Sequence, residues 1–394
     1  MAETARACEV CGGRSVTSLH EQAFALPGGE TLRYRVVACD GCGFVFADGI
    51  PSPEEYQRYY AGNQRYTYEG SKNVPRGLRQ THEGIFRAVD SFLRARAGGG
   101  DRLGLTVLDM GCATGHLLSF FKENGYRHLT GVDPAPECRE IASRLYGIDV
   151  ETSPLQEYRR TGWGLVVLSS VLEHLPDLAR SVRHIAGLVA PGGRVAVQVP
   201  DAASFGVNLR EPFLEFSLEH INYFTRGSLR NVMEPAGFAE RHHQVDLLDN
   251  QGTTFPALTT VWERTGVAGR VTADPVGREA VTRYVARSRL VQATLEERID
   301  QLVSRGEDLA IWGAGSLTAR LLATTRLGQA RIRAVVDANP SLHGRSLAGV
   351  PISPPDSLRG QTLPVLVASY VYMDEIRSAL ETDLRYGGPI VTLA

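Results

Sequence analysis

Two aspartates and a run of small residues form the most chemically suggestive pattern in this chain of 394 residues. Asp109 ends an apolar stretch, the small-residue turn Gly111–Gly115 follows, and a helix with one apolar side begins near His116. Small side chains let the backbone approach a bulky ligand closely, and a helix N-terminus presents free N–H groups. Asp133 ends the next apolar strand, where a carboxylate can accept both hydrogen bonds of a ribose diol. The pattern predicts a Rossmann-like domain that binds an adenosine cofactor.

Neighbouring residues extend this expected cofactor site. Spaced glycines alone also fit nicotinamide cofactors, but Asp109 stands directly before the loop, where dehydrogenases usually place the first glycine. The segment Ser153–Leu155 carries no acidic side chain for an adenine amine, so we expect a backbone contact there. The predicted cofactor contacts are Asp109, Gly111, Cys112, Ala113, Gly115, Asp133, Pro134, Leu155 and Ser169.

A second candidate group is the adjacent pair Glu219 and His220, in an aromatic-rich segment. This segment follows the predicted strand over 194–199, and loops after the carboxyl ends of strands line the active crevice of an open α/β sheet. Adjacent side chains point in different directions, so one can face a substrate while the other orients a neighbour. Histidine is well suited to move a proton near neutral pH. The alternative is a histidine packed among aromatic rings with a satisfied hydrogen bond.

Four of the six cysteines form two Cys-x-x-Cys pairs near the N-terminus. Cys8 pairs with Cys11 and Cys39 with Cys42, and each pair is followed by a glycine that lets the chain turn around the sulfurs. Four thiolates in two such turns match tetrahedral Zn²⁺, and a closed site of this kind is structural rather than catalytic. A redox-active pair is the alternative interpretation.

Composition restricts the class of protein. Lys and Arg total 42 and Asp and Glu 44, so the formal net charge of −2 offers no basic surface for nucleic acid. No apolar run approaches the length of a membrane span, and the N-terminus lacks the basic-then-apolar pattern of a signal peptide. We therefore expect a cytoplasmic protein that acts on a small molecule, without a nucleic-acid or membrane partner, and make no prediction of its oligomeric state.

The elements that position these residues are predicted to form three units: one zinc-binding unit and two α/β domains. A zinc-binding ribbon and linker occupy residues 1–65, the cofactor-binding domain occupies 66–265, and a second Rossmann-like α/β domain occupies 266–394. In the third unit, Gly313–Gly315 follows a strand and Asp337 ends the next one. Because this pattern is a weak signal for a nucleotide, a substrate-holding or purely structural domain is the alternative.

The central unit resembles the class I S-adenosylmethionine-dependent methyltransferases over roughly residues 75–265. The resemblance rests on the small-residue loop, on the buried strand Leu165–Leu168 running into His174, and on the helix expected over 178–189 before a strand. It implies that S-adenosylmethionine is the cofactor and that methyl transfer is the reaction. The alternative is a doubly wound domain that binds no cofactor.

The whole domain order is similar to that of the sugar C-methyltransferases of antibiotic biosynthesis. This resemblance implies methylation of C3 in a nucleotide-linked 4-keto-deoxysugar through an enolate. By the match, His220 is the base and Glu219 its polar partner. His174 lies next to the expected methyl group, and Tyr68 matches a tyrosine-rich segment over the cofactor; either side chain is expected to stabilise the enolate. For His174, the alternative is that it only shapes the cofactor pocket.

Two positions depart from these families and leave other functions open. Ala113 stands where a glycine is common, and Ser217 stands where the C-methyltransferases have a functional tyrosine. O-methyltransferases also carry Glu-His-x-x-x-Phe in this loop. Methylation of oxygen or nitrogen in a sugar or other natural-product intermediate is therefore the second hypothesis. A non-enzymatic zinc-ribbon binding protein is the third, although the intact glycines and aspartates of the loop argue against it.

Overall fold

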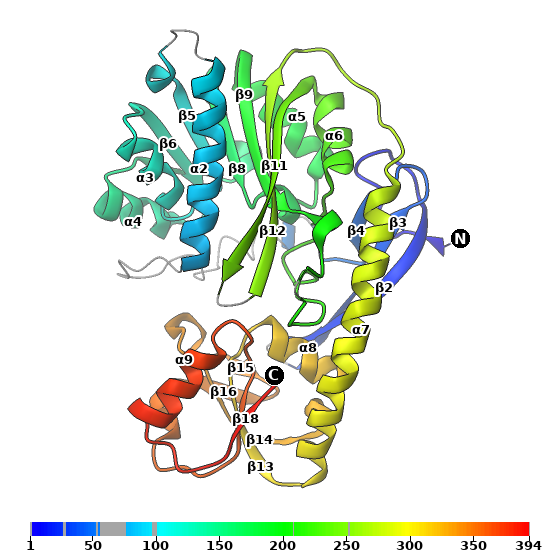
Figure 1. Cartoon of the computed structure of the whole chain (residues 1–394), viewed down its shortest axis with the longest axis vertical. Helices are drawn as coiled ribbons and strands as arrows, with labels where there is room; N and C mark the ends of the chain where they lie inside the picture. The colour runs from blue at the N-terminus through cyan, green and yellow to red at the C-terminus, as the bar shows by residue number, and fades with distance from the viewer. Residues whose placement is uncertain are drawn as a thin grey trace.

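In the part of the chain that the structure describes, the architecture comprises three β-sheets, the helices that cover them and one long helix beside them (Figure 1). The computed structural model describes residues 2–26, 29–52, 54–55, 76–96, 101–207, 209–250 and 253–393. The central sheet stands above the C-terminal sheet in the view of Figure 1, and the N-terminal strands lie beside both. Helix α7 (Pro275–Ser304) runs along this side of the molecule from the N-terminal strands to the C-terminal sheet.

The central sheet has seven strands in the order β11-β12-β9-β8-β5-β6-β7, and only β12 runs antiparallel to its neighbours. Alternate residues of each strand face opposite sides, so Val107 packs with α2 and α3 while Leu108 packs with α5 and α6. Parallel strands buried on both faces require such continuous apolar runs. The strands are β5 (Thr106–Met110), β6 (His128–Asp133), β7 (Val150–Thr152), β8 (Trp163–Ser169), β9 (Val189–Pro200), β11 (Phe238–Asn250) and β12 (Thr253–Arg264).

Helices cover both faces of this sheet, as the sequence predicted. The helix expected over 178–189 ends one residue earlier. Strand β9 begins directly after it and contains an irregularity between the pairs Trp163–Val189 and Leu165–Arg194. A left-handed Gly192 (φ +72°) accommodates this irregularity. The helices are α2 (Arg76–Arg96), α3 (His116–Glu123), α4 (Pro136–Tyr146), α5 (Leu178–Leu188) and α6 (Arg226–Met233).

The N-terminal sheet is completed by a strand from a distant part of the chain. Its order is β1-β2-β3-β4-β10, and β10 (Asn222–Tyr223) pairs antiparallel with β4 directly after the Glu219–His220 pair. This pairing ties the expected catalytic segment to the cysteine-bearing sheet. The other strands are β1 (Ala2–Glu3), β2 (Ser15–Ala25), β3 (Thr31–Cys39) and β4 (Val45–Asp48).

The C-terminal sheet confirms a second Rossmann-like unit. Its order is β15-β16-β14-β13-β17-β18, and every pair except β15–β16 is parallel. Its strands are β13 (Asp308–Trp312), β14 (Arg331–Val336), β15 (Ser346–Leu347), β16 (Val350–Ser353), β17 (Val365–Val367) and β18 (Ile390–Thr392), with helices α8 (Ser316–Thr324) and α9 (Met373–Ser378).

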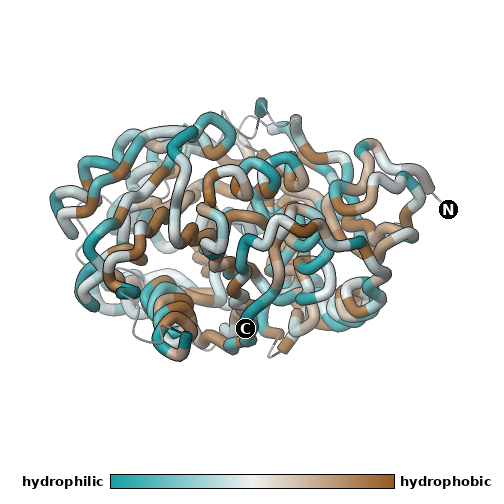
Figure 2. Tube along the Cα trace, turned by 90° about the horizontal axis from the view of Figure 1, so that it is seen from above, coloured by the Kyte–Doolittle hydropathy of each residue, from teal (hydrophilic) through white to brown (hydrophobic). Residues whose placement is uncertain are grey.

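The distribution of hydropathy agrees with these layers. In Figure 2, helical turns at the periphery carry both apolar and polar residues, as expected for helices with one face on a sheet. Within the described part of the chain, no helix combines the length and apolar character needed to cross a bilayer.

Candidate active site

The loop after β5 packs closely against the rest of the central domain. Gly111 and Gly115 both have a φ of +78°, and a Cβ on Gly111 would lie 2.9 Å from Cγ2 of Val171. Ala113 adopts a φ of +44°, in a region that non-glycine residues rarely enter. Its N–H donates a 2.9 Å hydrogen bond to Oδ2 of Asp133, which holds the loop in this conformation. The loop therefore needs small residues at these positions.

Asp133 fixes this loop by accepting two backbone hydrogen bonds. Its Oδ1 accepts the N–H of Ala135 at 2.9 Å, while Oδ2 accepts that of Ala113. Burial raises the pKa of Asp133, although these two hydrogen bonds oppose that shift. Burial, and then the charge of Asp133, raise the pKa of Asp109 to about 7. The two carboxyl groups thus stand together at the end of β5 and β6 in a poorly solvated environment.

The remaining predicted cofactor contacts lie along the same edge of the sheet. Strands β5, β6, β7 and β8 are parallel, so the residues that follow them meet at their carboxyl ends. Leu155 is buried in the turn after β7, and the Ser169 hydroxyl at the end of β8 donates to Oε1 of Gln198 at 3.3 Å. Burial raises the pKa of the Cys112 thiol well above its usual value, in keeping with a packing role.

His174 and His220 are brought together at this edge from different segments. Their ring centroids are 5.0 Å apart and the planes meet at 70°. Nδ1 of His174 lies 3.0 Å from the carbonyl oxygen of Glu219, so Nδ1 carries a proton and donates it. In the neutral tautomer the lone pair is then on Nε2, which lies 3.9 Å from Oε1 of Glu173.

The segment that carries His220 is attached to the turn after β8 by hydrogen bonds to backbone carbonyls of that turn. The Ile221 N–H donates to the carbonyl of Glu173 at 2.8 Å, and the side-chain Nδ2 of Asn222 donates to the carbonyls of Leu172 and Leu175 at 3.0 and 2.8 Å. The Ser217 hydroxyl accepts the N–H groups of Glu219 and His220 at 3.2 and 3.0 Å. Ser217 therefore shapes the turn at the position where the sugar C-methyltransferases that this chain resembles have a tyrosine.

Three side chains of the site were not predicted from the sequence: Glu173, His82 and His116. Glu173 is 1% exposed, burial raises its pKa, and neither carboxylate oxygen has a hydrogen bond among the residues described. Its place beside His174 in the motif was the available signal. His82 and His116 lie against the cofactor loop with their Nδ1 atoms 2.8 Å apart. Burial lowers their pKa values to about 3 and about 4, so both are neutral at pH 7.

Tyr68, which the resemblance placed over the cofactor, lies outside the described residues. Its role stays a prediction.

The four predicted metal ligands converge at the tip of the N-terminal sheet. The sulfurs of Cys8 and Cys42 are 3.6 Å apart, those of Cys11 and Cys39 are 3.4 Å apart, and all four lie within 4.8 Å of one another. A hydrogen bond from Cys42 lowers the pKa of the Cys8 thiol to about 6. Such a set of converging sulfurs fits a tetrahedral Zn²⁺ site and contains no cysteine at disulfide distance.

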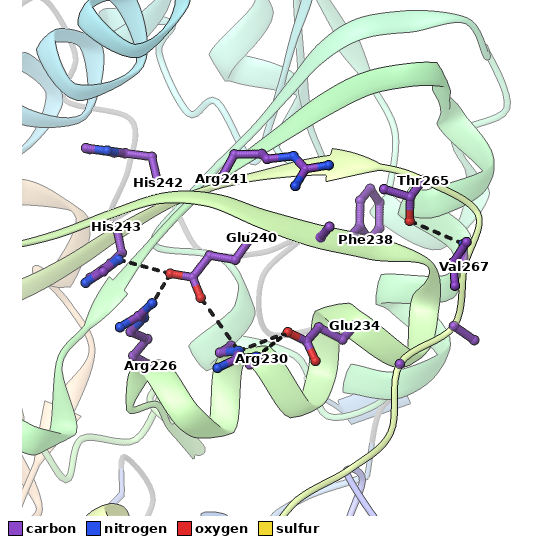
Figure 3. A pocket seen from close by; sticks show the side chains of 13 residues that line it. Arg226, Arg230, Glu234, Phe238, Glu240, Arg241, His242, His243, Thr265 and Val267 are labelled. Carbon is purple, nitrogen blue, oxygen red and sulfur yellow. Dashed lines mark hydrogen bonds and ion pairs between the residues drawn. The ribbon is translucent and has the colours of Figure 1, made fainter.

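A surface hollow elsewhere on the central sheet does not have the character of an active site (Figure 3). It lies between α6 and the start of β11, at the opposite edge from the cofactor loop. Three of its basic side chains point toward its carboxylates: Arg226 donates to Glu240 at 2.8 Å, Arg230 contacts Glu234 at 2.9 Å, and His243 lies 3.1 Å from Glu240 (Figure 3). These three basic side chains are therefore paired within the hollow, whereas Arg241 pairs with Glu263, which does not line it, at 2.9 Å.

Comparisons with known proteins agree with this geometry. Residues 79–243 match a family described as a methyltransferase domain, and residues 276–393 match the C-methyltransferase C-terminal domain. The chain is 28% identical to the C-methyltransferase NovU of Streptomyces niveus over 92% of this chain and 87% of that protein. It is 31% identical to a ubiquinone biosynthesis O-methyltransferase of Methylocella silvestris over 40% of this chain and 65% of that enzyme.

These matches and the cofactor loop define the class of protein. The chain is a class I S-adenosylmethionine-dependent methyltransferase. Within that class it carries the C-terminal domain of C-methyltransferases and is similar to one of them over most of its length.

Proposed function

We propose that this enzyme transfers a methyl group to C3 of a nucleotide-linked 4-keto-deoxysugar in a secondary-metabolite pathway. The observation that carries the proposal is the contact between the rings of His174 and His220 at the carboxyl ends of the central strands. The two histidines come from different segments, and His174 hydrogen-bonds the backbone carbonyl of Glu219 beside His220. The similarity to a C-methyltransferase over 92% of the chain supports carbon as the methylated atom. A cytoplasmic location and a nucleotide-sugar substrate belong to the same proposal.

The residues around the loop after β5 fit S-adenosylmethionine. Gly111 leaves no room for a side chain, and Asp133 stands where a ribose diol is expected. The bound cofactor would supply an electrophilic methyl group on a sulfonium, which is already a good leaving group. The protein's tasks are therefore to align the carbon nucleophile, to exclude water and to remove a proton.

His220 is the proposed base that takes the proton from C3, with Glu219 as its polar partner. The electron pair of the C3–H bond becomes an enolate whose oxygen needs a hydrogen-bond donor. His174 can supply that donor from Nε2 when it is protonated, because its Nδ1–H is held by the Glu219 carbonyl and Glu173 lies 3.9 Å from Nε2. Tyr68 is the other proposed donor. The enolate carbon then takes the methyl group and the ketone is restored.

The cysteine cluster is proposed to hold a structural Zn²⁺. Four sulfurs leave no open coordination position, so the ion would stabilise the N-terminal sheet and take no part in methyl transfer.

Methylation of oxygen is the second candidate function, because an O-methyltransferase matches the central region and the Glu-His pair occurs in that class as well. Incubation with methyl-labelled S-adenosylmethionine and nucleotide 4-keto-6-deoxysugars in deuterated water separates the two. If carbon is methylated, the C3 hydrogen of the sugar should exchange with deuterium in the incubation without cofactor. A new methyl group should appear on C3 in the incubation with cofactor. Methyl transfer to a hydroxyl without C3 exchange would establish the second function instead.

A further inference from the structure

The loop that leads to His220 contains one residue in a strained conformation. Phe213 has a φ of +55°, which bulky side chains rarely adopt. Its ring stacks on His20 of β2 with centroids 4.2 Å apart. Its N–H donates to the Ser288 hydroxyl at 3.2 Å, and its carbonyl accepts a hydrogen bond from Nη1 of Arg320 at 3.1 Å. Both polar backbone groups of this strained residue are therefore bonded to elements outside the central sheet, and the carbonyl also accepts the N–H of Phe216 within the loop at 3.0 Å.

Arg320 reaches the loop at two points. It lies in α8 of the C-terminal domain and is 2% exposed. Besides the carbonyl of Phe213, its Nη2 bonds Oε1 of Glu211 at 3.2 Å, and Glu211 is itself buried. A guanidinium with two fixed donors can hold a planar carboxylate and a carbonyl at the same time, which a lysine cannot reproduce.

The residues that follow Phe213 are held in the same way. The Glu215 N–H donates to the Tyr284 hydroxyl of α7 at 3.1 Å. From the N-terminal sheet, the Gln22 amide donates to the Phe216 carbonyl at 3.2 Å and the Tyr34 hydroxyl donates to the Ser217 carbonyl at 2.9 Å. Ser217 in turn accepts the N–H groups of Glu219 and His220, so these anchors continue directly to the proposed base.

We propose that Arg320 is a positioning residue of the methyl-transfer reaction, and that the C-terminal domain thereby sets the position of His220. This inference rests on the proposed function for the role of His220 and adds a task for the third domain. Methyl transfer to carbon requires base and cofactor in one geometry, and misplacement of about 1 Å is costly to the rate. A strained loop reaches that geometry only while its surroundings hold it.

The test compares Arg320→Lys with Arg320→Ala and with a matched arginine elsewhere on the same domain. Arg320→Lys keeps a cation opposite Glu211 but loses the second donor to Phe213. Arg326→Ala removes an arginine that is about half exposed and whose side chain contacts Asp300 and Ser304 at the C-terminal end of α7. Each full-length variant is assayed for S-adenosylmethionine affinity, for kcat and KM, and for hydrogen exchange in peptides spanning 211–224, β5 and α3.

The proposal expects a selective effect. In Arg320→Lys, kcat should fall at least tenfold while KM and the cofactor dissociation constant change less than threefold, and exchange should rise in 211–224 but not in β5 or α3. Arg326→Ala should match the wild type. If Arg320→Ala does not fold, Ser288→Ala replaces it, because it removes the hydroxyl that accepts the Phe213 N–H without leaving a buried charge.

Either of two results for Arg320→Lys would overturn this role of Arg320. The first is a kcat within threefold of the wild-type value, measured well below the melting temperature. The second is unchanged backbone hydrogen exchange in residues 211–224. If the wild type methylates no keto-sugar, the proposed function fails. The exchange measurements need no substrate, so they still decide whether Arg320 holds the loop.

Discussion

Nδ1 of His174 donates to the backbone carbonyl of Glu219, and this contact makes the two site histidines inequivalent. His174 is fixed by the residue next to His220, and its Nε2 faces Glu173 at 3.9 Å. His220 is held through its backbone N–H by Ser217. The His174 ring is thus oriented by its hydrogen bond to the Glu219 carbonyl, whereas His220 belongs to a segment that Ser217 anchors.

The first prediction concerns this inequivalence. His220→Ala should abolish C3 hydrogen exchange and lower kcat by about 10²- to 10⁴-fold, because general-base catalysis contributes on that scale. His174→Ala should lower kcat while retaining measurable exchange. Exchange is followed by NMR in deuterated water and cofactor affinity by calorimetry. His184→Ala, on α5 outside the site, is the control. Full exchange in His220→Ala would remove this histidine from the role of base.

Local signals account for what the sequence predicted correctly. The strand ending at Asp109, the small-residue turn and the strand ending at Asp133 are continuous in the chain, and their periodicity and glycines suffice to place them. The four cysteines were likewise predictable from spacing, because two Cys-x-x-Cys turns on one hairpin must meet when the strands pair.

The missed features depend on contacts between distant segments. No local pattern predicts that β10 pairs with β4, that Arg320 reaches Glu211, or that His82 meets His116. Such partners are chosen by tertiary packing, which single-sequence patterns do not encode. Ser217 was identified only as a departure from a family. Its role as a double acceptor became visible once the turn at Glu219 was known.

The second prediction uses a geometry that occurs twice in the chain. Asp133 accepts the N–H groups of Ala113 and Ala135, and Asp337 accepts those of Ala314 and Asn339 in the C-terminal domain. Asp133→Asn should weaken S-adenosylmethionine binding about tenfold or more, because it removes a charged acceptor of about 1.5–3 kcal/mol.

Asp337→Asn is the matched control and should leave that affinity unchanged in the same calorimetric titration. Equal losses in both variants would indicate a general effect on stability instead of a cofactor contact at Asp133.

The third prediction tests the packing of the second cysteine turn on α7. A Cβ on Gly43 would lie 1.9 Å from the carbonyl oxygen of Asp274, whereas Gly12 has a similar φ but no atom within 4 Å. Gly12→Ala should cost about 1–2 kcal/mol of unfolding free energy from backbone strain alone. Gly43→Ala should cost about 1–3 kcal/mol more from the overlap. Equal melting temperatures of the two variants would contradict this close approach.

The fourth prediction concerns the proposed zinc ion. Elemental analysis should find one zinc per chain, and Cys39→Ser should reduce that content and lower the melting temperature, because a structural zinc contributes folding free energy. Cys138→Ser, at a buried cysteine outside the cluster, should keep its zinc. Retention of full zinc content in Cys39→Ser would contradict the four-sulfur site.

The fifth prediction is a pH dependence of stability that arises from Glu215. Burial, and then the nearby carboxyl of Glu211, raise the pKa of Glu215 from its ordinary value of 4.5 to about 8. Between these two values the unfolded chain releases this proton while the folded protein keeps it. Stability therefore falls as pH rises, by at most about 1.4 kcal/mol per pH unit. Between pH 5 and pH 8, the free energy of unfolding of Glu215→Gln, measured with denaturant, should therefore rise relative to that of the wild type. The control is Glu297→Gln, on an exposed face of α7, whose free energy of unfolding should follow the wild-type pH dependence. Parallel curves for Glu215→Gln would show that this carboxyl titrates as it does in the unfolded chain.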